Sequence, residues 1–220
     1  MLLPPDCLPG IADLIGDIDD VGIPDIDIAG AADLFVDPKT KDVFDNSRKA
    51  WHDVSKVEPR CDFSPGRALL KPKSRIFVLC LWRKSPKGRT FSEIKNDPAC
   101  IPMFSDCMSA FIHRCVGHSL KRSEWALLTP PPRRHLEGNF AQSVAKFIAP
   151  DLGVDFVHDA FRSRNRQRVN AEFDVVNVPA QNNLIIFDDI LTTGSTMLAC
   201  HRALQPFNKN IIFFAAICNE

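Results

Sequence analysis

Residues 184–196 place two carboxylates and a hydroxyl-rich turn after an apolar run. The segment reads L-I-I-F-D-D-I-L-T-T-G-S-T, and Leu184–Phe187 has the continuous apolar character of a parallel strand buried on both faces. Asp188 and Asp189 then fall at the carboxyl end of this strand, which is where open α/β sheets bind ligands. A carboxylate pair accepts hydrogen bonds from vicinal hydroxyl groups, such as those of a ribose.

The turn that follows the aspartates is suited to a phosphate. Thr192–Thr196 combines backbone N–H groups and side-chain hydroxyls with the permissive Gly194, and Met197–Leu204 then starts a helical pattern. Backbone N–H groups at a helix N-terminus form an anion site. A ribose 5-phosphate therefore fits both halves of the segment at once.

This thirteen-residue pattern resembles, without gaps, the PRPP (5-phosphoribosyl 1-pyrophosphate) motif of the type I phosphoribosyltransferases. The resemblance implies that Asp188 and Asp189 hold the ribose 2- and 3-hydroxyls as catalytic residues. It also implies a 5-phosphate site made of Thr192, Thr193, Gly194, Ser195 and Thr196.

The segment has two other interpretations. An ordinary buried strand with turn residues explains the apolar run and the aspartates, whereas the adjoining T-T-G-S-T makes the motif specific. The Walker B strand of an ATPase needs a G-x-x-x-x-G-K-[ST] loop as its partner. The nearest candidate, Gly66 to Ser74, has Pro72 where the second glycine must be, which excludes the ATPase.

A proline-rich loop supplies two arginines. Residues 127–142 read L-L-T-P-P-P-R-R-H-L-E-G-N-F-A-Q, so that a strand enters a stiff loop. Bidentate guanidinium groups at Arg133 and Arg134 suit a pyrophosphate, although a connector with solvated arginines has the same composition. The block is similar to the P-x-P and R-G-F-N-Q-A elements of ComF-like proteins, with Glu137 in place of the arginine before Gly138.

A second basic segment, residues 161–173, reads F-R-S-R-N-R-Q-R-V-N-A-E-F. Its alternating arginines would lie on one side of an extended chain, and we expect them to lack partners until an anion binds. The end of the segment looks like the R-x-N-x-x-F element of ComF-like proteins, which implies a mobile loop over the substrate. Arg164 and Arg166 are the catalytic candidates and Arg168 a substrate-binding candidate. An exposed basic hairpin is the alternative.

Strands that alternate with helices predict an open, mainly parallel sheet with helices on both faces, the type I phosphoribosyltransferase fold. The helices are expected at residues 101–118, 139–148 and 197–204, the first with Met103, Cys107, Phe111 and Cys115 on one face. The expected strands are 75–82, 125–128, 154–157, 184–187 and 211–217. We expect a phosphoribosyltransferase-like domain over residues 75–220 and an acidic N-terminal extension, or hood, over residues 1–74.

Composition restricts the function further. Residues 1–45 hold eleven aspartates and two lysines, a net charge of −9, so the remaining residues carry +9 in a chain of net charge zero. A basic body suits a polyanionic small ligand, and nucleic acid is not expected because no Lys/Arg cluster is interleaved with aromatics. The sequence has no apolar run near 18 residues and no signal peptide, which predicts a cytoplasmic protein. Its eight cysteines form no CxxC pairs, so free thiols and no metal site are expected.

The predicted activity is that of a phosphoribosyltransferase, which moves ribose 5-phosphate from PRPP to a nitrogen base and releases pyrophosphate. Mg²⁺ is expected as a cofactor carried mainly by PRPP, because this ion keeps waters and phosphate oxygens as ligands. The expected partners are PRPP and a small base, with a homodimer as one option for assembly. The alternative is a non-catalytic PRPP- or nucleotide-binding regulatory protein, since fold does not fix function.

Overall fold

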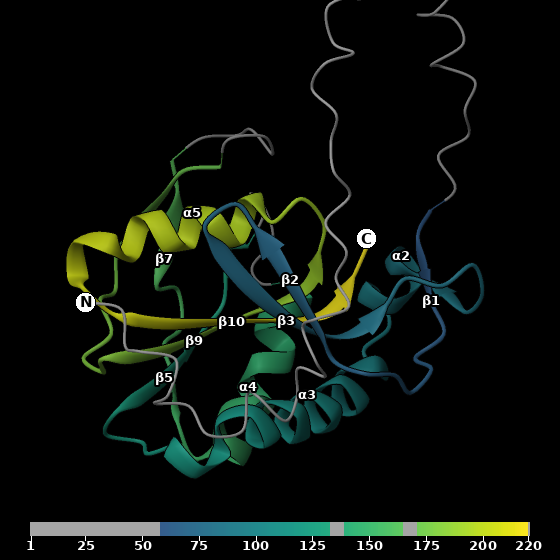
Figure 1. Ribbon diagram of the computed structural model, residues 1–220, viewed down its shortest axis with the longest axis horizontal. Helices are drawn as coiled ribbons and strands as arrows, with labels where there is room; N and C mark the ends of the chain where they lie inside the picture. The colour runs from purple at the N-terminus through teal and green to yellow at the C-terminus, as the bar shows by residue number, and fades with distance from the viewer. Residues whose placement is uncertain (1–57, 133–138, 165–170, 220) are drawn as a thin grey trace, which may run out of the picture. The chain divides into compact units, whose positions relative to one another are not determined.

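The structure is a computed structural model that describes residues 58–132, 139–164 and 171–219 (Figure 1). Most of the expected hood, residues 1–57, lies outside the described residues. The division of the chain into residues 1–74 and 75–220 therefore stays a prediction.

A six-stranded sheet organises the chain, in the order β2-β3-β10-β9-β5-β6. The pairs of neighbouring strands from β3 to β6 are parallel, and β2 pairs antiparallel with β3 at the edge. The strands are β2 Leu69–Lys73, β3 Ile76–Arg83, β5 Trp125–Leu128, β6 Asp155–Phe156, β9 Asn183–Leu191 and β10 Asn210–Cys218. The register places Ile211 of β10 and Ala126 of β5 on either side of Leu184 in β9.

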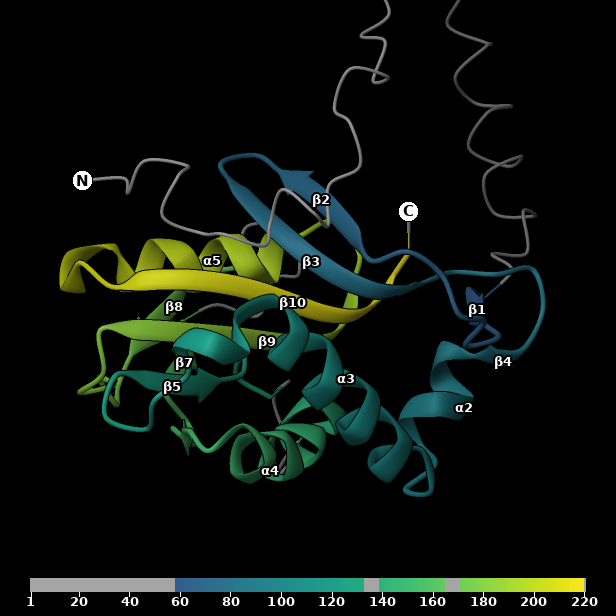
Figure 2. The ribbon, with the colours of Figure 1, turned by 60° about the horizontal axis from the view of Figure 1, so that its bottom comes forward.

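Helices cover both faces of the sheet (Figure 2). Helices α3, Cys100–Val116, and α4, Phe140–Leu152, pack on one face, where they share a buried cluster with Ile185 and Phe187. Helix α5, Ser195–Leu204, packs on the other face against Leu184 and Ile186. Because both faces of β9 are buried, its sequence is continuously apolar up to Phe187. The expected fold class is confirmed.

Smaller elements complete the described chain. Strands β1, Arg60–Cys61, and β4, Arg89–Thr90, form an antiparallel pair, and so do β7, Phe161–Ser163, and β8, Phe173–Val175. The five-residue helix α2, Phe91–Lys95, precedes α3, and the 3-10 turns η4 and η5 occupy Gly117–Ser119 and Gln205–Phe207. No helix of the described residues is long and apolar enough to cross a membrane.

The structure differs from the sequence expectations in two ways that concern the site. Strand β9 does not end at Phe187 but stays paired with β10 as far as Leu191. In addition, β2 is an unexpected edge strand that contains Pro72, and an edge is where a sheet tolerates a residue without an N–H group.

The buried face of α3 is also shifted from the expected one. Phe104, Met108 and Ile112 are fully buried. Of the expected face, Phe111 is buried as well, whereas Met103, Cys107 and Cys115 are only partly buried against the same cluster. Apolar residues recur every four positions along both stripes, so spacing alone does not select the stripe that faces the sheet.

We predict that Phe104→Ala lowers the free energy of unfolding by about 3–5 kcal/mol, because it leaves a cavity in a closed aromatic cluster. The Phe104 ring is fully buried, with its centroid 5.1 Å from those of both Trp82 and Phe140. Urea denaturation measures the change. Phe147→Ala on α4 is the control, because that ring is 56% exposed. Equal losses in the two variants would contradict this account of the core.

Candidate functional site

Asp188 and Asp189 lie within the paired part of β9, not beyond its end. Asp188 is opposite Ala215 of β10 in the ladder, and pairing continues to Leu191. Asp189 is buried, with 6% of its surface exposed, and Asp188 is half-buried. Two carboxylates in consecutive positions of a central strand require compensation, because burial strongly disfavours an isolated charge.

The two aspartates have different neighbours. Both carboxylate oxygens of Asp189 contact Nζ of Lys95, at 3.0 Å for Oδ1 and 2.8 Å for Oδ2. Asp188 Oδ1 instead accepts a hydrogen bond of 2.9 Å from the Asp189 N–H. The charge of Asp188 also raises the pKa of the Cys200 thiol, which belongs to α5. Successive strand residues project to opposite faces, which agrees with Lys95 coming from α2 and Cys200 from α5.

The pKa of the Asp188 carboxyl is raised well above its usual range. Burial is the main cause, the adjacent charge of Asp189 adds to it, and Lys95 acts in the opposite direction. Burial likewise raises the pKa of the Cys200 thiol, with the charge of Asp188 as a further cause. The charges of the acidic pair thus interact with Lys95 of α2 on one face of the sheet and with Cys200 of α5 on the other.

The turn after β9 has the geometry of an anion cradle. Gly194 precedes α5 with φ of 78°, a left-handed conformation that favours glycine. Gly194 offers this helix no side-chain cap, and among the first-turn N–H groups that of Ser195 donates to Thr193 Oγ1 at 3.4 Å. The hydroxyls of Thr193 and Ser195 lie 2.8 Å apart on the exposed side of the turn. An oxyanion placed there would meet both hydroxyls and the positive end of α5.

Lys73 lies against this turn although it is 121 positions away in sequence. It is the last residue of β2, and the β2–β3 hairpin curls so that its turn is next to α5 (Figures 1 and 2). A Cβ atom added to Gly194 would be 2.8 Å from Cγ and 3.0 Å from Cβ of Lys73. The glycine therefore allows a basic side chain to approach the cradle.

The proline-rich loop and the basic segment share a pocket of about 350 Å³. The loop follows β5, and the basic segment begins in β7. The pocket is lined by Pro131, Pro132, Asp159, Phe161, Arg162, Ser163 and Val176. Arg133 and Arg134 continue the loop beyond Pro132 but lie outside the described residues, so their predicted role stays a prediction.

Arg164 has an internal partner. Its Nε and Nη2 lie 2.6 Å and 2.5 Å from Oδ1 of Asp174, on the neighbouring strand β8. The expectation that the arginines of this segment lack partners is therefore wrong for Arg164, because the β7–β8 hairpin brings a carboxylate beside it. Arg166 and Arg168 lie outside the described residues.

Asp159 is a further polar residue of the pocket. It has φ of 50°, an uncommon conformation for a residue with a side chain. Its carboxylate contacts Nε2 of Gln142 at 3.3 Å and Nδ1 of His158 at 2.6 Å. Gln142 also forms a capping box with Asn139 at the start of α4, so the terminus of this helix holds the side chain of Asp159, which lines the pocket.

Sequence reasoning missed Lys95, Lys73 and Asp159. The T-F-S-E pattern at Thr90 is a capping box and indicates the start of α2. Nothing local in the sequence links Lys95 to an aspartate 94 positions later, and Lys73 gives no local signal of its contact. Among the described residues, no three His, Cys, Asp or Glu side chains gather as a set of metal ligands.

No family model and no curated protein sequence matches the chain. Solved structures with a similar backbone include adenine phosphoribosyltransferases of Saccharomyces cerevisiae and Leishmania tarentolae. The yeast structure, a complex with adenine and an imino-altritol bisphosphate, is 18% identical, covers 69% of this chain and 83% of its own, and has a TM-score of 0.39. The Leishmania structure is 13% identical, with coverages of 68% and 94% and a TM-score of 0.42.

A hypoxanthine phosphoribosyltransferase of Staphylococcus aureus is also similar, at 14% identity, coverages of 52% and 61%, and a TM-score of 0.34. All three TM-scores are below 0.5, so these similarities do not establish a family. What the site does must follow from the residues of this chain.

We predict that Asp188→Asn makes the folded protein more stable at neutral pH. The carboxyl pKa is raised on folding, so the native state binds more protons than the unfolded state above the ordinary aspartate pKa of about 4. Wild-type stability therefore falls as pH rises through this range, and each pKa unit contributes about 1.4 kcal/mol. The variant removes this fall. Urea denaturation between pH 3 and pH 8 measures it.

Asp155→Asn is the matched control. Asp155 lies in the edge strand β6 and forms an exposed ion pair with Arg122. Its effect should be below about 1 kcal/mol at every pH. A loss of stability at pH 7 in Asp188→Asn would contradict the burial cost assigned to this carboxylate.

Proposed function

We propose that the chain is a phosphoribosyltransferase, which transfers ribose 5-phosphate from PRPP to a small nitrogen base and releases pyrophosphate. The observation that carries the proposal is one continuous segment in which five residues separate a carboxylate pair, Asp188 half-buried and Asp189 buried, from the start of α5 at Ser195. Diol acceptors and phosphate donors thus lie on one rigid support. The order of these groups along the chain corresponds to the diol and the phosphate of a ribose 5-phosphate.

In the proposed reaction, Asp188 is the better placed carboxylate for the ribose hydroxyls. It is half-buried, and its described hydrogen bonds come from Asp189 alone, whereas both oxygens of Asp189 contact Lys95. Loss of pyrophosphate leaves an oxocarbenium-like sugar, so that nearby carboxylates and a fixed phosphate contribute by positioning and by stabilising charge. The Thr193 and Ser195 hydroxyls, with the N–H groups of α5, hold the 5-phosphate.

The pyrophosphate is assigned to the pocket between the proline-rich loop and β7. Arg162 lines this pocket, and Arg164 can exchange the Asp174 carboxylate for a phosphate oxygen because their ion pair is exposed. Magnesium would be carried mainly by PRPP and would neutralise part of the pyrophosphate charge there. No cluster of protein ligands is needed for a metal that keeps phosphate oxygens and waters.

The more specific assignment is to the ComF-like branch, in the cytoplasm. It is supported by the P-P-P-R-R element after β5 and by the R-x-N-x-x-F element that ends in β8. A regulatory PRPP-binding protein is distinguished from the enzyme by one property. Such a protein binds PRPP without accelerating the release of pyrophosphate.

We expect the purified full-length chain to release pyrophosphate from PRPP and Mg²⁺ in the presence of at least one base from a panel of purines and pyrimidines. The double variant Asp188→Asn, Asp189→Asn should lose PRPP affinity by about a hundredfold or more, because the hydroxyls lose charged acceptors. Calorimetry measures binding and a coupled phosphate assay measures turnover. Asp155→Asn serves as the control for loss of an aspartate in the sheet.

Binding without turnover on any base would favour the regulatory alternative. Wild-type affinity in the double variant would remove the ribose role of the aspartates.

A second prediction concerns the cradle. Gly194→Val should weaken inorganic phosphate and ribose 5-phosphate binding by about tenfold or more, because the new Cβ meets Lys73 and the left-handed backbone becomes strained. Gly153→Val is the control, since Gly153 also has positive φ, but nothing lies within 4 Å of an added Cβ. Calorimetric titration of both variants compares the sites. Equal affinities in the two variants would exclude Gly194 from the phosphate site.

A further inference from the structure

The ion pair between Lys95 and Asp189 differs from the other ion pairs of the described residues. The Asp189 side chain is 9% exposed and that of Lys95 is 36% exposed. In every other pair between a basic side chain and a carboxylate, the carboxylate is at least 33% exposed. Exposed pairs contribute little to stability, whereas removing the partner of a buried carboxylate is strongly destabilising.

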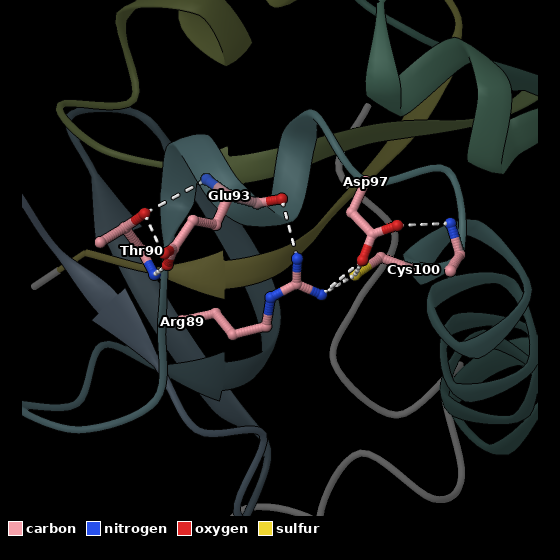
Figure 3. Close-up of polar contacts among 6 residues, drawn as sticks. Arg89, Thr90, Glu93, Asp97 and Cys100 are labelled. Atoms are coloured by element: carbon pink, nitrogen blue, oxygen red, sulfur yellow. Dashed lines mark hydrogen bonds and ion pairs between the residues drawn. The ribbon is translucent and has the colours of Figure 1, made fainter.

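The helix that carries Lys95 is braced at both ends (Figure 3). At its start, Thr90 and Glu93 form a reciprocal capping box, with the Glu93 N–H donating to Thr90 Oγ1 at 3.2 Å. Near its end, Arg89 donates to the Glu93 carbonyl at 3.2 Å and pairs with Asp97 at 2.7 Å.

Two further contacts attach this brace to the rest of the domain. Arg89 Nη1 also donates to Sγ of Cys100, the first residue of α3, at 3.0 Å. Phe91 and Ile94 are buried in the same core cluster as α3 and α4. A five-residue helix has little stability of its own. These contacts hold α2 in place, so that the backbone at Lys95 is fixed before any ligand binds.

Lys95 is the described cation that acts on the acidic pair. Asp188 and Asp189 repel each other when both are ionised, and the charge of Asp188 also raises the pKa of the Cys200 thiol. The positive charge of Lys95 lowers the pKa of Asp188 against the larger effects of burial and of Asp189. Lys95 therefore contacts Asp189 directly and favours ionisation of Asp188 through its charge.

We propose that Lys95 is a positioning residue of the substrate site, which fixes the Asp189 carboxylate and keeps Asp188 available as the acceptor for the vicinal hydroxyls of a ribose 5-phosphate. The ligand part rests on the proposed function. The positioning part concerns the acidic pair itself, so it can be measured without a ligand. Lys95 is not assigned to the reacting atoms.

The test compares the full-length wild type with Lys95→Met, Lys95→Arg and the double variant Lys95→Met, Asp189→Asn. Lys121→Met is the matched control, because Lys121 pairs with Glu124 at an exposed position before β5. Carbon-13 NMR of aspartate-labelled protein follows the Asp188 carboxyl through a pH titration, with Asp188→Asn as the assignment standard. Calorimetry measures ribose 5-phosphate and inorganic phosphate affinities at pH 6, 7 and 8.

In Lys95→Met, the Asp188 titration should move to higher pH, and ribose 5-phosphate should bind about tenfold more weakly at pH 7. Part of the loss should be recovered at pH 8, where more Asp188 is ionised. Inorganic phosphate affinity should not change, because the cradle is intact. Lys95→Arg should keep most of the affinity, and Lys121→Met all of it.

The double variant is the control for a folding defect in Lys95→Met, because it also removes the buried charge of Asp189. It should recover thermal stability, and the Asp188 titration should return to lower pH, because the charge of Asp189 no longer raises the pKa of Asp188. A titration that stays where it lies in Lys95→Met would contradict the charge coupling on which the positioning role depends. An unchanged Asp188 titration in Lys95→Met would overturn the positioning role whether or not the wild type binds sugar phosphates. If the titration moves but the wild type binds neither PRPP nor ribose 5-phosphate, the proposed function fails and the ligand part of the inference fails with it.

Discussion

The burial of two adjacent carboxylates in the central strand is the constraint on which the rest of the site depends. Asp188 and Asp189 follow four fully buried residues of β9 and remain within the hydrogen-bonded ladder. Without compensation this arrangement would favour the neutral acids and destabilise the sheet. The fold compensates for it only in part, because Lys95 contacts one of the two carboxylates and the pKa of the other stays raised. An acidic pair left incompletely neutralised can accept further hydrogen bonds.

Three elements on different sides of the sheet bring positive charge to the acidic pair or to the turn that follows it. Helix α5 starts directly after β9, so the positive end of its dipole lies a few residues beyond the aspartates. The short helix α2 supplies Lys95, and the β2–β3 hairpin brings Lys73 against Gly194. Neither β2 nor α2 was among the elements predicted from the sequence. Segments outside the core motif therefore contribute charge to a site whose backbone is set by the motif.

Stability and function oppose each other at this strand. A hydrophobic residue at Asp188 would suit its half-buried position better than a carboxylate with a raised pKa. The brace of Arg89, Asp97 and Cys100 around α2 likewise serves to hold one lysine in place, since α2 contributes only Phe91 and Ile94 to the core. Interactions that are poor for stability alone are common at sites that bind charged ligands.

The sequence by itself determined the parallel sheet, the helices on both faces and the order of the acidic pair and the phosphate turn, because these depend on periodicity and on residues that are adjacent in the chain. Tertiary structure decided what depends on distant partners. Ladder pairing with β10 carried β9 past Phe187, hairpin formation gave Arg164 the partner Asp174, and packing brought Lys95 to Asp189 across 94 positions. An ion pair between distant residues leaves no local pattern, since either residue alone is an ordinary charged side chain.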